Sequence, residues 1–185
     1  ATHGIPMHLD GARLFNAIAA TTLPPASYAQ HFDTLSVCLS KGLGAPAGSL
    51  LLMNDLTLLD RAKRLRRMYG GAMRQSGVLA AAGIYALEHH LGRLKEDHDH
   101  AKRLARQLQH LSTVRINPQD VDTNIVIFGV LGHRLGPSAI VAALKQEGLL
   151  INAIGGNSFR AVTHLDISSA MVEEACTIFT RVLGG

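Results

Sequence analysis

Two charged residues that follow apolar stretches have the chemistry needed to hold an organic cofactor. Asp10 comes directly after the stretch 5–9, which is preceded by the turn residue Gly4. Lys41 comes shortly after a second apolar stretch, 35–39. Open α/β sheets bind ligands at the carboxyl ends of their strands, where a lysine can bind phosphate as a point charge or provide an amine for Schiff-base chemistry. Position alone is equally compatible with a solvated loop lysine and with an aspartate that forms a cap or turn.

Neighbouring polar residues and glycines extend both candidate segments. Arg13 lies three positions after Asp10, and Ser40 lies directly before Lys41. Ser40 could donate a hydrogen bond to a cofactor phosphate, although a serine at the end of a strand bonds the local backbone as often. The glycines that follow Lys41 would let a cofactor approach the main chain closely. These four side chains are therefore our first candidates for cofactor contacts.

Four segments of the sequence resemble the low-specificity L-threonine aldolases. They occur in the order found in that family and run through nearly the whole chain: HLDGARLFNA at 8–17, SVCLSKGLGAPAGS at 36–49, MYGGAMRQSG at 68–77 and RAVTHLD at 160–166. The resemblance implies an α/β protein of the aspartate aminotransferase fold class. The chain would form the later part of a mostly parallel large domain and a small α+β carboxyl-terminal domain. We expect the amino-terminal half of the family to be missing from it.

The resemblance also implies a role for each matching charged residue. Lys41 matches the lysine that forms the internal aldimine with pyridoxal 5'-phosphate. Asp10 matches the carboxylate beside the pyridine nitrogen, where negative charge keeps that nitrogen protonated and the ring an effective electron sink. Arg13 and Arg160 match the arginines that bind the substrate carboxylate through both of its oxygens. Arg74 matches a position near the cofactor phosphate, although a surface arginine near a helix start is equally compatible with the sequence.

The implied activity is that of an aldehyde-lyase acting on L-threonine, L-allo-threonine and other β-hydroxy amino acids. A base would remove the β-hydroxyl proton, the bond between Cα and Cβ would break, and glycine and an aldehyde would be released. The family works as a homotetramer, a dimer of dimers with active sites at the dimer interfaces. Because residues that stack on the cofactor ring belong to the missing half, we expect weak or no activity from the 185-residue chain alone.

Three alternative interpretations stay open. A related fold-type I lyase or an aminotransferase-like enzyme could use the same Lys41 and Asp10 to break a different bond. A non-catalytic α/β fragment could instead bind an upstream partner through exposed apolar surface. A nucleic-acid binder could use the basic residues within 61–67, but an aromatic content of 4% without tryptophan argues against that partner.

The composition describes a globular chain. Hydrophobic residues make up 47% of it and charged residues 17%, a balance that excludes disorder as the main state. No apolar run reaches the roughly 18 residues that cross a bilayer, and residues 1–10 lack the pattern of a signal peptide. Cys38 and Cys176 lie in apolar stretches, as reduced core cysteines do. We therefore expect a soluble cytoplasmic protein with no membrane partner.

The hydrophobic pattern changes near residue 110, and we predict domains at 1–110 and 111–185. In the first we expect strands at 5–9, 35–39 and 48–53, and a long helix over 73–112 that is bent near Gly92. The second reads as a β-β-α-β-β-α unit, with its elements at 113–116, 123–128, 138–147, 149–152, 159–165 and 168–183.

The predicted long helix contains several histidines, which are common metal ligands, but their spacing does not indicate a metal site. They lack the i, i+4 pair of a helical zinc site and have no cysteine near them: His89, His90, His98 and His100. We expect no metal, and we expect these side chains on a solvated helix face. Thr123 and Asn124 read as the entry turn of a strand, and His164 as a residue that supports the site by packing or hydrogen bonding.

Overall fold

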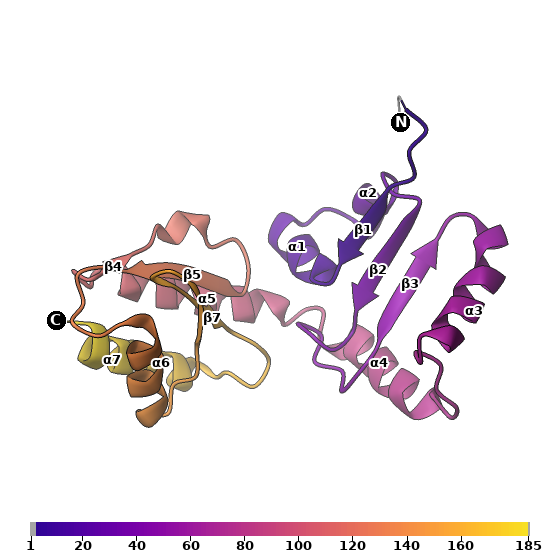
Figure 1. The fold of residues 1–185 in the computed structure, drawn as a ribbon. Coiled ribbons are helices and arrows are strands. Elements are labelled where there is room, and N and C mark those ends of the chain that lie inside the picture. Colours follow the sequence, from indigo (N-terminus) through magenta and orange to yellow (C-terminus); the bar gives the residue numbers. More distant parts are fainter. Residues whose placement is uncertain (1–2, 185) are drawn as a thin grey trace. The chain divides into compact units, whose positions relative to one another are not determined.

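The computed structural model describes residues 3–184, and the contacts within it divide the chain into two compact units. The first unit is Ala1–Gly92 and the second is Arg93–Gly185. Figure 1 labels the helices and strands of both. Each unit has its own sheet, so each is described separately below.

A three-stranded sheet in the order β1-β2-β3 forms the centre of the first unit. Its strands are β1 (His8–Gly11), β2 (Thr34–Cys38) and β3 (Ser49–Met53). β1 and β2 run parallel, whereas β3 is antiparallel to β2. All three strands lie close to where the apolar stretches predict them. β1 begins later than predicted and includes Asp10, because the pairing with β2 runs from His8 to Gly11.

In the residues that the structure describes, the first unit has four α-helices, and three of them contribute to its apolar clusters. They are α1 (Leu14–Thr21), α2 (Pro25–Ala29), α3 (Leu59–Met68) and α4 (Gly77–His89), with a short 3-10 turn η1 (Leu56–Leu58) before α3. Leu14 packs with Leu35 and Val37 of β2, and side chains of α1 and α2 surround this cluster. A second cluster joins Ala86 of α4 to the residues that follow β2. The sequence pattern did not predict α1 or α2.

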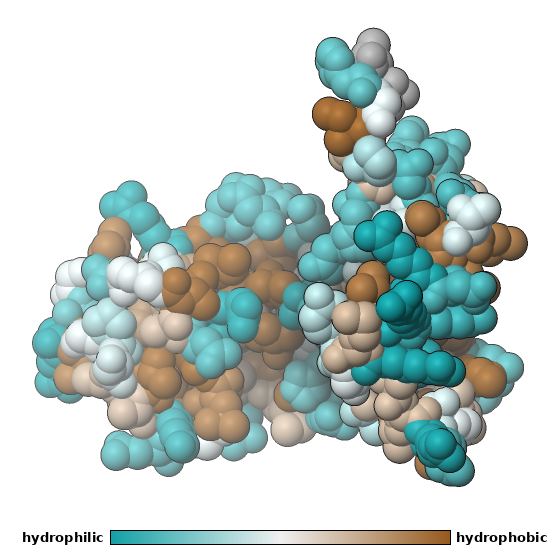
Figure 2. Space-filling view, turned by 45° about the vertical axis from the view of Figure 1, so that its right-hand side comes forward, coloured by the Kyte–Doolittle hydropathy of each residue, from teal (hydrophilic) through white to brown (hydrophobic). Residues whose placement is uncertain are grey.

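Much apolar surface of the first unit stays exposed. The edge strand β3 carries three consecutive leucines that are all exposed, although neighbouring side chains point to opposite faces: Leu50, Leu51 and Leu52. Val78, Ile84 and Tyr85 of α4 are also exposed. Figure 2 shows brown hydrophobic residues among teal hydrophilic ones on the visible surface.

A four-stranded sheet in the order β4-β5-β7-β6 forms the second unit, and all of its pairs are antiparallel. The elements are α5 (Leu94–Leu108), β4 (Val114–Arg115), η2 (Pro118–Asp120), β5 (Ile125–Val130), α6 (Pro137–Gln146), β6 (Asn152–Gly155), β7 (Ser158–Val162) and α7 (Ser169–Leu183). From β4 onward this is the predicted β-β-α-β-β-α order. Ser168 caps α7 by accepting a hydrogen bond from the amide of Met171.

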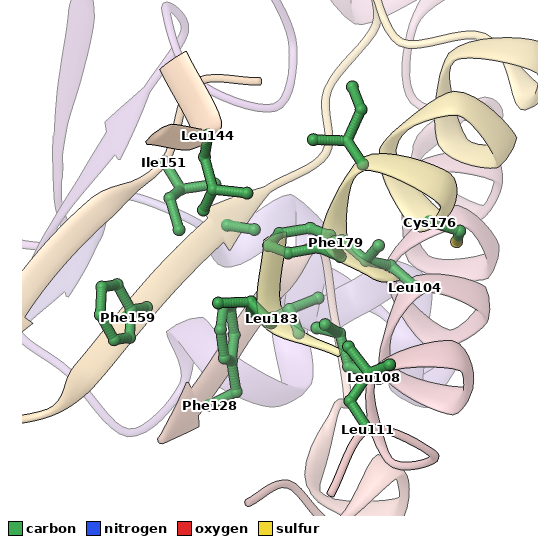
Figure 3. Packing of buried hydrophobic residues seen from close by; sticks show 14 of the residues in the cluster. Leu104, Leu108, Leu111, Phe128, Leu144, Ile151, Phe159, Cys176, Phe179 and Leu183 are labelled. Carbon is green, nitrogen blue, oxygen red and sulfur yellow. The ribbon is translucent and has the colours of Figure 1, made fainter. Parts of the chain in front are cut away.

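The core of the second unit is built around three phenylalanine rings (Figure 3). Phe128 of β5 stacks on Phe159 of β7 with ring centroids 5.6 Å apart. Phe179 of α7 meets Phe128 edge-on, also at 5.6 Å. Leu104 and Leu108 of α5 lie in the same cluster, so this helix closes the core of the second unit.

The position of α5 differs from our prediction of one long helix and of a boundary near residue 110. The helical pattern is interrupted at residues 90–93, and the apolar face of α5 packs against α7 and β5. The division therefore falls between Gly92 and Arg93, and α5 belongs to the second unit. Periodicity alone could not separate the two helices, because both are apolar on the face that each buries.

Helices of membrane-spanning length and hydropathy do not occur in the part of the chain that the structure describes.

Replacement of Phe179 by Ala should lower the free energy of unfolding by about 3–5 kcal/mol, because it removes a fully buried ring and leaves a cavity. Urea unfolding followed by circular dichroism measures the change. Met171→Ala is the matched control, since Met171 is exposed on the same helix and should cost less than about 1 kcal/mol. Equal losses in the two variants would contradict this account of the core.

Candidate functional site

Lys41 lies in a tight turn directly after β2. The amide of Gly44 donates to the carbonyl of Lys41 at 2.8 Å, and the amide of Ala45 donates to the carbonyl of Leu39 at 3.0 Å. Gly44 has φ +69°, a left-handed conformation that favours glycine. Leu43 is only 1% exposed and anchors the turn, whereas Lys41 is exposed. The turn therefore fixes the backbone of Lys41 and leaves its amine accessible.

Asp10 lies at the same end of the sheet as the Lys41 turn, where the carboxyl ends of β1 and β2 lie. Because β1 and β2 are parallel and Asp10 is opposite Ser36, both strands end there. The strands are packed closely here, since a Cβ on Gly11 would lie 2.5 Å from the carbonyl oxygen of Ser36. One oxygen of Asp10, Oδ1, accepts a hydrogen bond of 3.1 Å from the amide of Ala12. That bond orients the carboxylate.

Arg13 and Ser40 belong to the segments that follow the same two strand ends. Arg13 is half-buried and precedes α1, where its carbonyl accepts hydrogen bonds from the amides of Asn16 and Ala17. Ser40 is exposed in the Lys41 turn, with its Oγ 3.4 Å from Sγ of Cys38. The structure thus brings four of the six predicted site residues to the carboxyl edge of the β1–β2 pair.

The other two predicted residues lie elsewhere in the chain. Arg74 is exposed in the turn that precedes α4. Arg160 lies in β7 of the second unit, between Ile127 of β5 and Asn152 of β6. Its Nε is buried and has no hydrogen-bond partner among residues 3–184. An unpaired buried donor is costly, so this guanidinium is suited to an anionic ligand. The functional roles of all six residues remain predictions.

A large groove of the first unit is lined by neighbours of the candidate residues, Ser36 and Leu39, but not by the candidate residues themselves. It has a volume of about 790 Å³, and its lining includes neither Asp10 nor Lys41. The lining combines leucines and methionines with small residues and with Ser36 of β2 and Arg66 of α3. Arg66 is already engaged, since its Nε donates to the carbonyl of Gly71 at 2.8 Å. The candidate site is therefore identified by the residues at the carboxyl ends of β1 and β2, and not by the size of the groove.

Two histidines are buried where we predicted a solvated helix face. That prediction was wrong for His98 and His100 of α5, which are only 3% and 5% exposed. His100 Nε2 lies 3.0 Å from Oγ of Ser169, at the start of α7. Burial lowers the pKa of His98, an effect that the negative charge of Asp97 partly offsets. Within residues 3–184, no group of three or more potential ligand residues is arranged to hold a metal ion.

A chain of hydrogen bonds connects α5 to the end of β7. Thr163 Oγ1 donates to the carbonyl of Asp97 at 2.6 Å, and Asn124 Nδ2 donates to the carbonyl of Thr163 at 2.7 Å. The carboxylate of Asp97 accepts from Arg93 at 2.9 Å. Burial raises the pKa of Asp97, and the Arg93 charge counteracts that rise. These contacts hold the strand that carries Arg160.

Asn124 shows what the sequence analysis missed, because we interpreted it as an entry turn. It is 3% exposed and extends the β5–β7 pairing, since its carbonyl accepts a hydrogen bond from the amide of Thr163 at 3.0 Å. The sequence signal for this role is a polar residue directly before an apolar strand, which is also typical of turns. His164, next to Thr163, is exposed, and its Nδ1 lies 3.4 Å from the carboxylate of Asp166.

The cysteines agree with the sequence analysis, since neither forms a disulfide. Cys176 is buried in the second unit, and Cys38 is half-buried at the end of β2. Burial raises the pKa of the Cys176 thiol.

Residues 1–130 match the family model described as "Beta-eliminating lyase". The chain belongs to the beta-eliminating lyase family. This match includes both strands of the candidate site together with the Lys41 turn.

Curated relatives extend the similarity over almost the whole chain of this family member. It is 39% identical over 184 residues to "Low-specificity L-threonine aldolase 1" of Arabidopsis thaliana, which covers 98% of this chain and 51% of the relative. It is 44% identical over 170 residues to "Low specificity L-threonine aldolase" of Escherichia coli (strain K12), with 92% and 49% covered. The chain thus spans about half the length of these relatives.

Solved structures share the fold of this lyase-family chain. A putative L-allo-threonine aldolase from Listeria monocytogenes matches with a TM-score of 0.78 at 24% identity, over 98% of this chain and 53% of that protein. A threonine aldolase from Leishmania major matches with a TM-score of 0.74 at 18% identity, over 98% and 53%. The predicted fold class, the later part of a fold-type I large domain and a small α+β domain, is confirmed.

The buried His98 should make the second unit less stable in mild acid. Its folded pKa lies below the ordinary value of 6.5, so the unfolded chain takes up the proton first. The free energy of unfolding should therefore fall as the pH is lowered through 6.5 towards the folded pKa. Denaturant unfolding at pH values from 7.5 to 5.5 measures this slope.

A His98→Gln variant should have a smaller slope than the parent protein over the same pH range. His110→Gln is the control, because His110 is exposed just after α5 and its replacement should leave the slope unchanged. An unaltered slope in His98→Gln would show that burial of this ring does not cause the acid sensitivity.

Proposed function

We propose that the intact protein containing this chain is a pyridoxal-phosphate-dependent aldehyde-lyase. It cleaves L-threonine, L-allo-threonine and related β-hydroxy amino acids to glycine and an aldehyde. The observation that carries the proposal is that β1, which contains Asp10, and β2, which the Lys41 turn follows, are parallel neighbours and end on the same side of the sheet. Membership of the beta-eliminating lyase family and the names of the relatives support the same activity.

The side chains at this end of the sheet fit the chemical groups of pyridoxal phosphate. The cofactor has an aldehyde that an amine can attack, a ring nitrogen that a carboxylate can hold protonated, and a phosphate that needs donors. Lys41 provides the amine, Asp10 the carboxylate, and Ser40 an exposed hydroxyl. Arg74 is the further candidate for the phosphate. When bound, the cofactor supplies an electron sink for cleavage of a bond at Cα.

The residues of the chain would bind and orient the reactants. Lys41 would provide the amine that holds the cofactor aldehyde, and its turn fixes the main chain that carries this side chain. Asp10, whose Oδ1 accepts a hydrogen bond from the amide of Ala12, would hold the ring nitrogen in its protonated form. The resemblance assigns Arg13 and Arg160 to the substrate carboxylate, and binding of that carboxylate through both oxygens would select the bond at Cα that is cleaved. The buried, unpaired Nε of Arg160 supports that assignment.

The proposal includes an assembly and a location. We propose a homotetramer, a dimer of dimers, because the resemblance implies one and because Leu50, Leu51 and Tyr85 expose apolar surface that subunits could cover. We propose a cytoplasmic location, which two cysteines without a disulfide support.

The family description favours one alternative activity, elimination of a group from Cβ. The same Lys41 and Asp10 would serve such a reaction. Product analysis separates the two: L-threonine gives glycine and acetaldehyde in an aldolase, whereas elimination from L-serine gives ammonia and an oxo acid.

Replacement of Lys41 by Ala in the intact protein should lower glycine formation from L-threonine by about 10³-fold or more, because the covalent attachment point is lost. Borohydride reduction of the cofactor-loaded protein, followed by peptide mass spectrometry, should locate the cofactor on Lys41 in the parent only. Lys63→Ala is the matched control, since Lys63 is an exposed lysine of α3 in the same unit. Turnover or fixed cofactor in the Lys41 variant at the level of the control would refute the assignment.

A further inference from the structure

We propose that His90 is a positioning residue for Lys41, because it holds the turn of residues 41–44 against the end of α4. The inference rests on the role of Lys41 in the proposed function and adds a residue to that site. His90 Nδ1 lies 2.6 Å from the carbonyl oxygen of Leu43, although the two residues are 47 positions apart. Since a carbonyl only accepts, Nδ1 carries the hydrogen in this contact.

The hydrogen bond joins α4 to the turn of residues 41–44, and apolar side chains already pack these two segments together. Ala86 of α4 is buried against Leu39, Leu43 and Ala45, which flank and form the turn. A Cβ on Gly83 would lie 3.0 Å from Cδ1 of Leu39, so this face of the helix lies close to the segment after β2. The apolar contact sets the distance between α4 and the turn. Apolar packing is not directional, however, and does not by itself fix how the turn is oriented.

The hydrogen bond to Leu43 provides that direction. The bonds from Gly44 to Lys41 and from Ala45 to Leu39 are internal and close the turn on itself. The contact from His90 ties the carbonyl two residues after Lys41 to a different element. Lysine has a flexible four-carbon side chain, so a fixed main chain determines the region that its amine can reach. Correct placement of a reacting group is worth a large factor in rate.

The surroundings of His90 hold its ring in place. His90 is half-buried at the carboxyl end of α4, and the ring of Tyr85 lies edge-on at a centroid distance of 5.5 Å. The neighbouring His89 is exposed, and its own ring lies 4.2 Å from that of Tyr85. His89 therefore shares the helix end and the tyrosine contact with His90, which makes it a matched control.

The test compares His90→Ala, His90→Asn and His89→Ala in the intact protein. The side-chain amide of Asn can place an N–H near the position of Nδ1–H, so His90→Asn should behave like the parent. In His90→Ala without cofactor, hydrogen exchange at the amides of Gly44 and Ala45 should be about tenfold faster, while peptides from β1 and β2 keep their rates. His89→Ala should leave the exchange of the turn unchanged.

The second readout is the rate at which Lys41 is fixed to pyridoxal phosphate in the presence of borohydride. His90→Ala should lower that rate and kcat by about tenfold, with KM for the amino acid unchanged. Parent-like exchange and fixation in His90→Ala would overturn the positioning role, as would faster exchange spread evenly through the first unit. Absence of fixation in the parent would instead refute the proposed function, while the exchange experiment would still test the contact between His90 and the turn.

Discussion

The parallel pairing of β1 with β2 is the constraint on which the candidate site depends. Because the two strands are parallel, their carboxyl ends lie next to each other. Asp10, near the end of β1, and Lys41, in the turn after β2, therefore follow the same end of the sheet. Side chains alternate along a strand, and a slip of one residue would turn Asp10 to the opposite face. Gly11 stabilises this register, because no larger residue fits against the carbonyl of Ser36.

The second unit is held together partly by buried polar contacts. Asp97, Thr163 and Asn124 join α5 to the strand that carries Arg160 by hydrogen bonds between buried groups. Buried polar groups are costly when they lack partners, so such a chain of bonds permits few alternative arrangements. Two buried ring or side-chain nitrogens of this unit have no hydrogen-bond partner among the described residues, Nδ1 of His100 and Nε of Arg160. A rigid strand that carries an unsatisfied cation is well suited to bind a carboxylate.

The sequence predicts those features that depend on local pattern. Apolar stretches locate β1, β2 and β3, and a charged residue at or after the end of such a stretch is how the sequence predicts Asp10 and Lys41 as site residues. The sequence does not predict features that depend on tertiary contacts. The pattern of α5 continues that of α4, and only its contacts with α7 and β5 show that it belongs to the second unit. The burial of His98 is missed for the same reason, and Asn124, which does lie in the bend before β5, is buried where the sequence gives no sign of it. The role of His90 depends on a contact over 47 positions and has no local signal.

The edge strand β3 also has a practical consequence for anyone who works with the chain in isolation. Its three exposed leucines point to both faces, and its outer edge offers unpaired backbone groups in the described structure. Edges of this kind act as templates for strands of other molecules and so promote aggregation. Association of copies of the isolated chain through β3 will therefore increase with its concentration.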